Sequence, residues 1–194
     1  MKRHSWSWVR RGVVLLVLAG LACTAPEAQP DDARESTAPS DQAPAPDVVE
    51  QVDATLYYAS ADGAWLVPTR QEVPLASDTL AQGRQLLEAQ LGDAPDGLIS
   101  VFPAGTRLRG FYVTDRDEAL VDLSSEIAAA HPGGALREQL TVYAVVNAVT
   151  SNLPTIQRVQ ILIGGREVDT LAGHIDLRWP LEADPFLVRD ARPD

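Results

Sequence analysis

A single cysteine, Cys23, limits how this chain can be stabilised. Without a second cysteine no internal disulfide can form, so any folded part must be held together by its hydrophobic core. The stretch from Ala54 onward, about 140 residues, is long enough for one domain with such a core.

The N-terminus has the features of a secretory signal peptide. Four basic residues precede the apolar run from Gly12 to Ala22, which is too short for a membrane span of roughly 20 apolar residues. The small Ala22 stands directly before Cys23, as lipoprotein processing requires, although Leu21 is one place nearer than the usual branched residue. We predict a lipoprotein-type signal peptide over residues 1–22 and a lipid on Cys23; an ordinary signal peptide, cut near Ala22 without lipid, is the alternative.

Residues 23–53 are predicted to form a disordered tether. The segment is rich in proline, alanine and acidic residues and has almost no large apolar side chain. Such a composition cannot bury enough surface to offset the entropy of folding. A flexible coil of this length has an end-to-end distance of about 30 Å, so it would hold a folded domain away from an extracytoplasmic membrane surface.

The charge of the chain excludes some classes of partner. Beyond Ala22, 12 arginines stand against 27 acidic residues, a formal net charge of −15. Nucleic acid is not expected as a partner, because phosphate binding depends on clustered positive charge. Direct adhesion of the domain to an anionic lipid surface is disfavoured for the same reason, so membrane attachment is expected through the lipid on Cys23.

Hydrophobic patterning predicts two strands and a helix in the first half of the domain. Residues 54–59 and 65–73 have the composition of strands and are separated by a turn signal. Ser77 or Asp78 then caps a helix that ends near Leu91, because leucines recur at helical spacing in between.

The second half of the domain adds a hairpin, a long helix and a further strand. Residues 107–113 and 119–123 are predicted to pair as a hairpin, and a buried helix covers 135–152. A strand over 158–163 leads into a glycine turn after which 166–168 can pair back. We therefore predict an α+β fold, a mixed β-sheet with two helices on one face.

The C-terminal segment, residues 173–194, is predicted to pack back on the domain with Trp179 and Phe186 docked. It is also the most plausible place for a partner-binding strap. Trp65 allows two interpretations: a core tryptophan, which is favoured, or an exposed indole that stacks on a sugar or anchors a partner.

Short motifs follow one another along the predicted domain: Thr55-Leu56-Tyr57-Tyr58, Leu66-Val67-Pro68, Glu72-Val73-Pro74, Gly97-Leu98-Ile99-Ser100, Pro103-Ala104-Gly105-Thr106, Val121-Asp122-Leu123-Ser124-Ser125, and Val159-Gln160-Ile161-Leu162-Ile163 before Gly164-Gly165. In order and spacing they resemble the GerMN domain of spore-germination and sporulation proteins, over most of residues 54–172. The resemblance implies a fold like the ring-building modules of secretion machinery. It also implies a non-enzymatic, extracytoplasmic interaction module. Single-domain members occur in bacteria that make no spores, so a role in germination is not implied.

Two histidines raise the question of a metal site. His174 and Asp176 are two residues apart, so on a strand they would point the same way and could share a metal. Two ligands are too few and no third is placed by spacing, so a hydrogen-bonded surface pair is favoured. His131 lies in a predicted loop.

Other polar groups also have two interpretations. Ser124 and Ser125 could be nucleophiles, but no Gly-x-Ser-x-Gly elbow surrounds them. A helix cap by Ser124 or Ser125, with Asp122 at the end of a half-exposed strand, is favoured. Asp115 and Asp117, with Glu118, are favoured as turn residues over a weak calcium site, because the EF-hand glycine and distal glutamate are missing.

Two functional hypotheses follow. The first is a lipid-anchored envelope protein whose domain binds another envelope protein or a second copy of itself through a sheet edge or a helix face. The second is a cell-wall ligand-binding or hydrolytic module, suggested by the extracytoplasmic location and by Trp65. For the first hypothesis, we expect no catalytic residues, metal or cofactor, and the sequence identifies no small-molecule ligand.

Overall fold

Two β-sheets enclose a pair of helices in the computed structural model, which describes residues 50–189. The strands are β1 (Gln51–Ala59), β2 (Leu66–Pro74), β3 (Leu108–Val113), β4 (Glu118–Leu123), β5 (Arg158–Ile163) and β6 (Arg166–Glu167). The helices are α1 (Thr79–Gln90), α2 (Glu126–Ala129) and α3 (Ala135–Asn152), followed by the 3₁₀ turn η1 (Pro185–Leu187).

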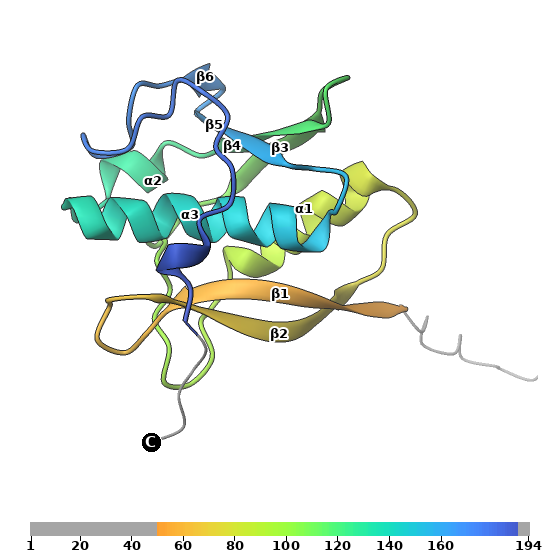
Figure 1. Ribbon diagram of the computed structural model, residues 1–194, viewed down its shortest axis with the longest axis horizontal. Coiled ribbons are helices and arrows are strands. Elements are labelled where there is room, and N and C mark those ends of the chain that lie inside the picture. The colour runs from red at the N-terminus through yellow and green to blue at the C-terminus, as the bar shows by residue number, and fades with distance from the viewer. Residues whose placement is uncertain (1–49, 190–194) are drawn as a thin grey trace, which may run out of the picture. The chain divides into compact units, whose positions relative to one another are not determined.

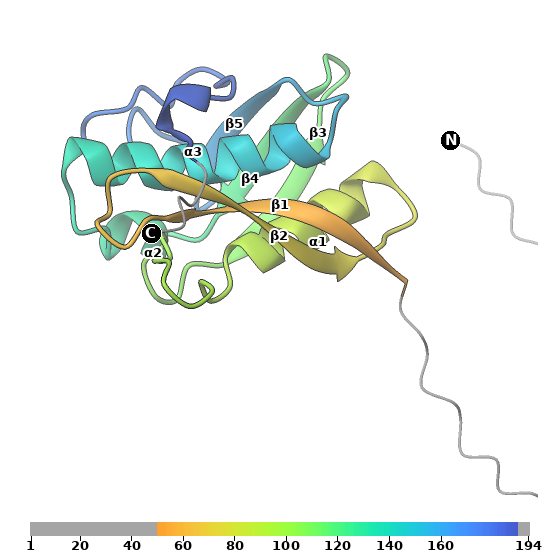
Figure 2. The ribbon, with the colours of Figure 1, turned by 60° about the horizontal axis from the view of Figure 1, so that its bottom comes forward.

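The predicted α+β class is confirmed, and the structure divides the strands between two sheets. The antiparallel pair β1–β2 is a sheet of its own, and the second sheet has the order β3-β4-β5-β6. Helices α1 and α3 lie between the two sheets, with α3 against β1 and β5 and α1 against β2 and β3 (Figures 1 and 2). Each sheet therefore has helices on one face.

The four-stranded sheet is mixed because one connection crosses over. Strands β3 and β4 form the predicted antiparallel hairpin, whereas β4 and β5 are parallel and are joined through α3. Every second residue of β4 and β5 faces the helices and is buried, as in Val121 and Ile161. Their neighbours face away from the helices.

The helices begin and end where the patterning predicts. The side chain of Asp78 caps α1 by accepting a hydrogen bond from the Ala81 amide at 2.9 Å. Helix α3 covers the predicted residues 135–152, and most of its middle turns are buried. At Gly83 the absence of a side chain lets α1 approach β3 closely, because an added Cβ would lie 2.2 Å from the ring of Phe111.

The outer edge of β1 is closed by side-chain amides. The Asn152 side chain accepts a hydrogen bond from the Thr55 amide and donates one to its carbonyl, both at 2.8 Å. Gln90 does the same for Tyr57, also at 2.8 Å, and Ile99 bridges to Ala59 through its backbone. These contacts occupy the groups that would otherwise pair β1 with another strand, which explains why the hairpin is a separate sheet.

The C-terminal segment returns to the domain, but its aromatic side chains do not dock. Leu177 and Leu187 are buried, whereas Trp179 is 70% exposed and Phe186 is 88% exposed. The prediction that Trp179 and Phe186 dock is wrong, because leucines take the inward positions of this segment. None of the helices within residues 50–189 combines the length and the apolar character needed to cross a membrane.

Candidate functional site

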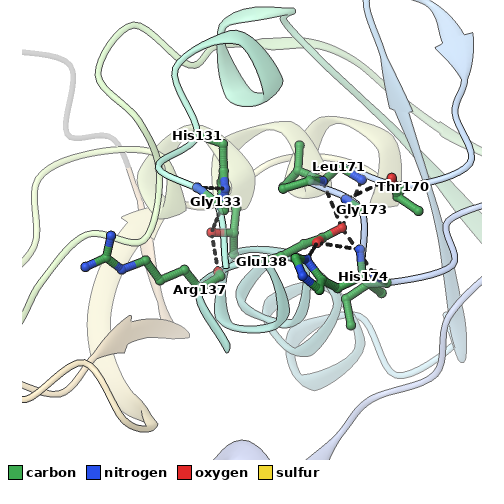
Figure 3. A network of polar contacts seen from close by, with 11 residues as sticks. His131, Gly133, Arg137, Glu138, Thr170, Leu171, Gly173 and His174 are labelled. Atoms are coloured by element: carbon green, nitrogen blue, oxygen red, sulfur yellow. Dashed lines mark hydrogen bonds and ion pairs between the residues drawn. The ribbon is translucent and has the colours of Figure 1, made fainter. Parts of the chain in front are cut away.

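A buried carboxylate organises the most extensive polar network in Figure 3. The Glu138 side chain is 0% exposed. Its Oε1 accepts hydrogen bonds from the amides of Leu171, Ala172 and Ile175 at 3.1, 2.9 and 3.2 Å. Its Oε2 accepts from the His174 amide at 2.8 Å and lies 2.9 Å from His174 Nδ1. One carboxylate of α3 thus binds a whole turn of the segment that follows β6.

The hydrogen bonds determine the ionisation of this carboxylate. Burial by itself raises the pKa of Glu138, but the amides of Ala172, Ile175 and His174, together with the His174 ring, lower it below its ordinary value. Glu138 is therefore ionised at neutral pH. The arrangement is a fixed anchor between α3 and the C-terminal segment, with its acceptor oxygens already in use.

The predicted pairing of His174 with Asp176 is wrong, because each has another partner. His174 binds Glu138, and Asp176 forms two hydrogen bonds with the side chain of Arg178, at 2.9 and 2.7 Å. The side chain and the amide of Arg178 lower the pKa of Asp176 to about 2. Among residues 50–189, no group of three or more His, Cys, Asp or Glu side chains is arranged to hold a metal ion.

The serines that follow β4 have structural contacts. Ser124 is buried and its hydroxyl accepts a hydrogen bond from the Arg107 amide at 2.9 Å. Ser125 occupies the position before α2, but its side chain makes no capping bond, so this part of the cap prediction is wrong. Asp122 is buried, and its carboxylate accepts hydrogen bonds from Arg109 and from the Gly165 amide.

The acidic residues between β3 and β4 form the turn of the hairpin. Asp117 has a positive φ of 56°, and the Thr114 amide donates to the Glu118 carbonyl at 2.9 Å to close the turn. Glu118 also pairs with Arg158 at 2.6 Å, so its carboxylate is used within the sheet.

Trp65 is half-buried and is covered on one face by an arginine. The guanidinium carbon of Arg189 lies 3.3 Å from the centre of the Trp65 ring, and the Arg189 amide donates to the Leu66 carbonyl at 2.9 Å. The favoured interpretation as a core tryptophan is therefore wrong. The face under Arg189 is closed to a stacking sugar, because the C-terminal segment holds the guanidinium there.

His131 lies beside a cavity at the beginning of α3. Its Nδ1 accepts a hydrogen bond from the Gly133 amide at 3.0 Å, and its Nε2 lies 3.2 Å from the Thr141 hydroxyl. Burial lowers the pKa of His131, although the charge of Glu138 opposes the shift. The cavity has a volume of about 340 Å³, and its remaining lining comes from the β1–β2 turn, from the segment around Ile99 and from α3.

The edge of β3 differs from the other long edges. Thr114 pairs with Glu118 through hydrogen bonds, so in an antiparallel register the backbone groups of Phe111 and Val113 point away from β4. Within the part of the chain that the structure describes, no hydrogen bond occupies these outward groups. On the sheet face opposite the helices, next to this edge, Tyr112 is 51% exposed.

Sequence reasoning missed Glu138, although the sequence carries a signal for it. Helix 135–152 is apolar around most of its circumference, and Glu138 shares one face with Val142 and Val145. A charged residue on such a face must be buried, and a buried charge requires partners. The partners themselves lie more than 30 positions away and could not be identified from helical spacing.

Cys23 lies outside the described residues, as do the predicted signal peptide and most of the tether.

Comparison with known proteins supports the sequence resemblance. A family model described as "Germane: Sporulation and spore germination" matches residues 55–169. The first GerMN domain of the sporulation protein GerM from Bacillus subtilis has 22% identity and a TM-score of 0.52, covering 70% of this chain and 98% of that chain. The tandem GerMN domains of the same protein have 20% identity and a TM-score of 0.51, covering 70% of this chain and 46% of that one. The resemblance to the GerMN domain is thereby confirmed.

A third structure, a protein of Clostridium perfringens provisionally described as a lipoprotein, has 26% identity and a TM-score of 0.49, covering 71% of this chain and 91% of that chain. No curated protein matches the chain.

Proposed function

We propose that this chain, which belongs to the family described as "Germane: Sporulation and spore germination", is a non-enzymatic envelope lipoprotein. In this proposal its GerMN-like domain binds a protein partner. The partner is another envelope protein or a second copy of the chain. The non-enzymatic part of the proposal is supported by the use of Glu138, His174, Asp122 and Ser124 in structural hydrogen bonds.

The observation that carries the proposal is the open edge of β3. The edge of β1 is closed by Gln90, Asn152 and Ile99. The other long edges are protected in part: β2 contains two prolines and its Leu66 carbonyl accepts a hydrogen bond from the Arg189 amide, and β5 pairs with β6 and with Leu181. Strand β3 contains no proline, and its outward backbone groups at Phe111 and Val113 are unoccupied among the described residues, which is the geometry that accepts an added strand.

The surface beside this edge also suits a protein partner. On the face away from the helices, Tyr112, Leu120 and Leu162 contribute partly exposed apolar side chains in neighbouring strands. The ion pairs Arg109–Asp122 and Glu118–Arg158 lie on the same sheet. An apolar strip bounded by charged pairs gives a strand both hydrogen bonds along the edge and a surface for its alternate side chains.

Substitution of Val113 by proline tests strand addition. The Val113 amide points outward, so proline removes a free donor without breaking a bond to β4. With a photo-crosslinking amino acid at position 112, we expect a discrete cross-linked product in cells that falls at least about fivefold in Val113→Pro. Arg70→Pro is the matched control, because the Arg70 amide also points outward, from β2, and this variant should retain the product.

The thermal midpoints of these variants must stay close to that of the parent. If Val113→Pro lowers the midpoint, Leu120→Glu provides a second variant that leaves the edge backbone intact and disrupts the apolar strip. A product that persists in both variants, or is absent from the parent, would contradict strand addition at β3.

Substitution of Cys23 by alanine tests the anchor separately. We expect the parent chain in the membrane fraction, with a mature mass that begins at Cys23 and carries a diacyl- or triacyl-glyceryl group. Cys23→Ala should move to the soluble fraction, because one or two acyl chains supply the membrane affinity. A parent chain recovered in the soluble fraction, cut at or after Ala22 and without lipid, would overturn the anchoring proposal but not the interaction at β3.

A further inference from the structure

The cavity at the beginning of α3 has the size of a small-ligand site. Its volume of about 340 Å³ is at the lower end of the range of about 300–1,000 Å³ that is typical of such sites. Ile99, Val101 and Leu140 give it an apolar lining, and Ser100 contributes a hydroxyl. An occupant must therefore be small and partly apolar.

The polar wall of this cavity is fixed by hydrogen bonds. The Thr141 hydroxyl lies 2.8 Å from the Val101 carbonyl and 2.9 Å from the Arg137 carbonyl, and it contacts the His131 ring. The Gly133 amide holds the other side of that ring. Because these groups are already paired, the wall is preorganised and ligand binding need not order it.

Two side chains of opposite charge, Asp62 and Arg137, line the cavity, and only that of Arg137 has no hydrogen-bond or ion-pair partner among the described residues. The Oδ1 atom of Asp62 accepts hydrogen bonds from Ser60 and from the Ala64 amide within its own turn. Arg137 forms no ion pair with any residue of 50–189. In Figure 3 its side chain extends away from the Glu138 network. The site therefore offers an arginine without a carboxylate partner beside an apolar floor.

We propose that this cavity binds the carboxylate end of a short peptide with small side chains. Arg137 pairs with the terminal carboxylate, for which its planar guanidinium is well suited. Ile99 and Leu140 contact the small aliphatic side chains. Such an end occurs in peptidoglycan stem peptides that finish in D-alanine and in the C-termini of proteins. The proposal goes beyond strand addition at β3 and does not depend on it, because the two surfaces share no residue.

Titration of the full chain in detergent with acetyl-Ala-Ala, followed by heteronuclear NMR, tests the site. We expect saturable shifts at residues 99–101 and 131–141, and no saturable shifts with acetyl-Ala-Ala-amide, which lacks the carboxylate. Arg137→Gln should weaken binding by about tenfold or more, as expected for the loss of a charge-assisted pair. Arg84→Gln, an exposed arginine of α1 outside the cavity, makes the same charge change and should bind like the parent.

Ala61→Trp is a second variant, because a large side chain at this exposed turn position should block the cavity while Arg137 stays in place. Comparison of acetyl-Lys-D-Ala-D-Ala with acetyl-Lys-L-Ala-L-Ala distinguishes the two sources of the carboxylate. Tighter binding of the D-peptide indicates a peptidoglycan stem peptide, and tighter binding of the L-peptide indicates a protein C-terminus. Equal shifts with the acid and the amide, unchanged affinity in Arg137→Gln, or no saturable shift with any peptide would overturn the proposal. None of these results bears on cross-linking at β3.

Discussion

Replacing Glu138 by alanine is expected to lower the free energy of unfolding by about 3–5 kcal/mol, because several hydrogen bonds to a buried charged group are lost together. The carboxylate has no exposed surface and accepts hydrogen bonds from four backbone amides and from His174. Its removal leaves four amides without their acceptor, one of them buried and three partly buried, and each buried donor that stays unpaired costs free energy. Denaturant unfolding followed by tryptophan fluorescence measures the change.

Two variants make this result specific. Glu88→Ala makes the same chemical change at an exposed position of α1 and should alter stability by less than about 0.5 kcal/mol. His174→Ala removes the ring but leaves the four amide bonds, so we expect a loss of about 1 kcal/mol. An effect of Glu138→Ala no larger than that of His174→Ala would show that the amides find other acceptors and that the anchor is not formed.

The contribution of Glu138 should also depend on pH. Its pKa is lower in the folded protein than in the unfolded chain, so the unfolded state binds the proton more readily. The stabilisation is therefore fully present above the unfolded value, about pH 4.3, and is lost as pH falls through the folded pKa. The stability difference between the parent and Glu138→Gln should be constant near neutrality and should shrink below about pH 4.

Replacing Gln90 by leucine is the second substitution with a large expected effect, a loss of about 2–4 kcal/mol. Gln90 is fully buried and its amide pairs with both backbone groups of Tyr57 at 2.8 Å. Leucine keeps much of the volume but cannot hydrogen-bond. The backbone N–H and C=O groups of Tyr57 are then left unpaired in an apolar environment. Chemical denaturation with an unchanged m-value would show that stability, rather than compactness, has changed.

Gln85→Leu is the matched control for this substitution. Gln85 lies on the same helix but is only partly buried, so the same change there should cost less than about 0.5 kcal/mol. If Gln90→Leu is as stable as the parent, the closure of the β1 edge by side-chain amides is not important for stability.

Local sequence patterns predicted most elements because their causes are local. Alternation of apolar residues gave the hairpin of β3 and β4, the cap at Asp78 placed the start of α1, and helical spacing placed α3 over 135–152. The α+β class and the resemblance to the GerMN domain came from the same information and were confirmed.

The predictions that failed concern the environment of individual side chains. Sequence spacing paired His174 with Asp176, but Glu138 is the partner of His174 because α3 brings it under that loop. Trp179 and Phe186 were expected to dock on the strength of their apolar surface, yet leucines fill the available positions. Large apolar residues remain exposed when no space in the core fits them.

For this protein, the sequence by itself determined the fold class, the order of its elements and the family. These depend on composition and on contacts between residues a few positions apart. Only the tertiary structure decided which strand edge stays open, which carboxylate is buried and which arginine faces the cavity without a partner. Such properties depend on groups that are 30 to 100 positions apart in the chain, as when Asn152 closes the edge of β1 at Thr55. They are set by how the helices pack between the two sheets, which no local pattern specifies.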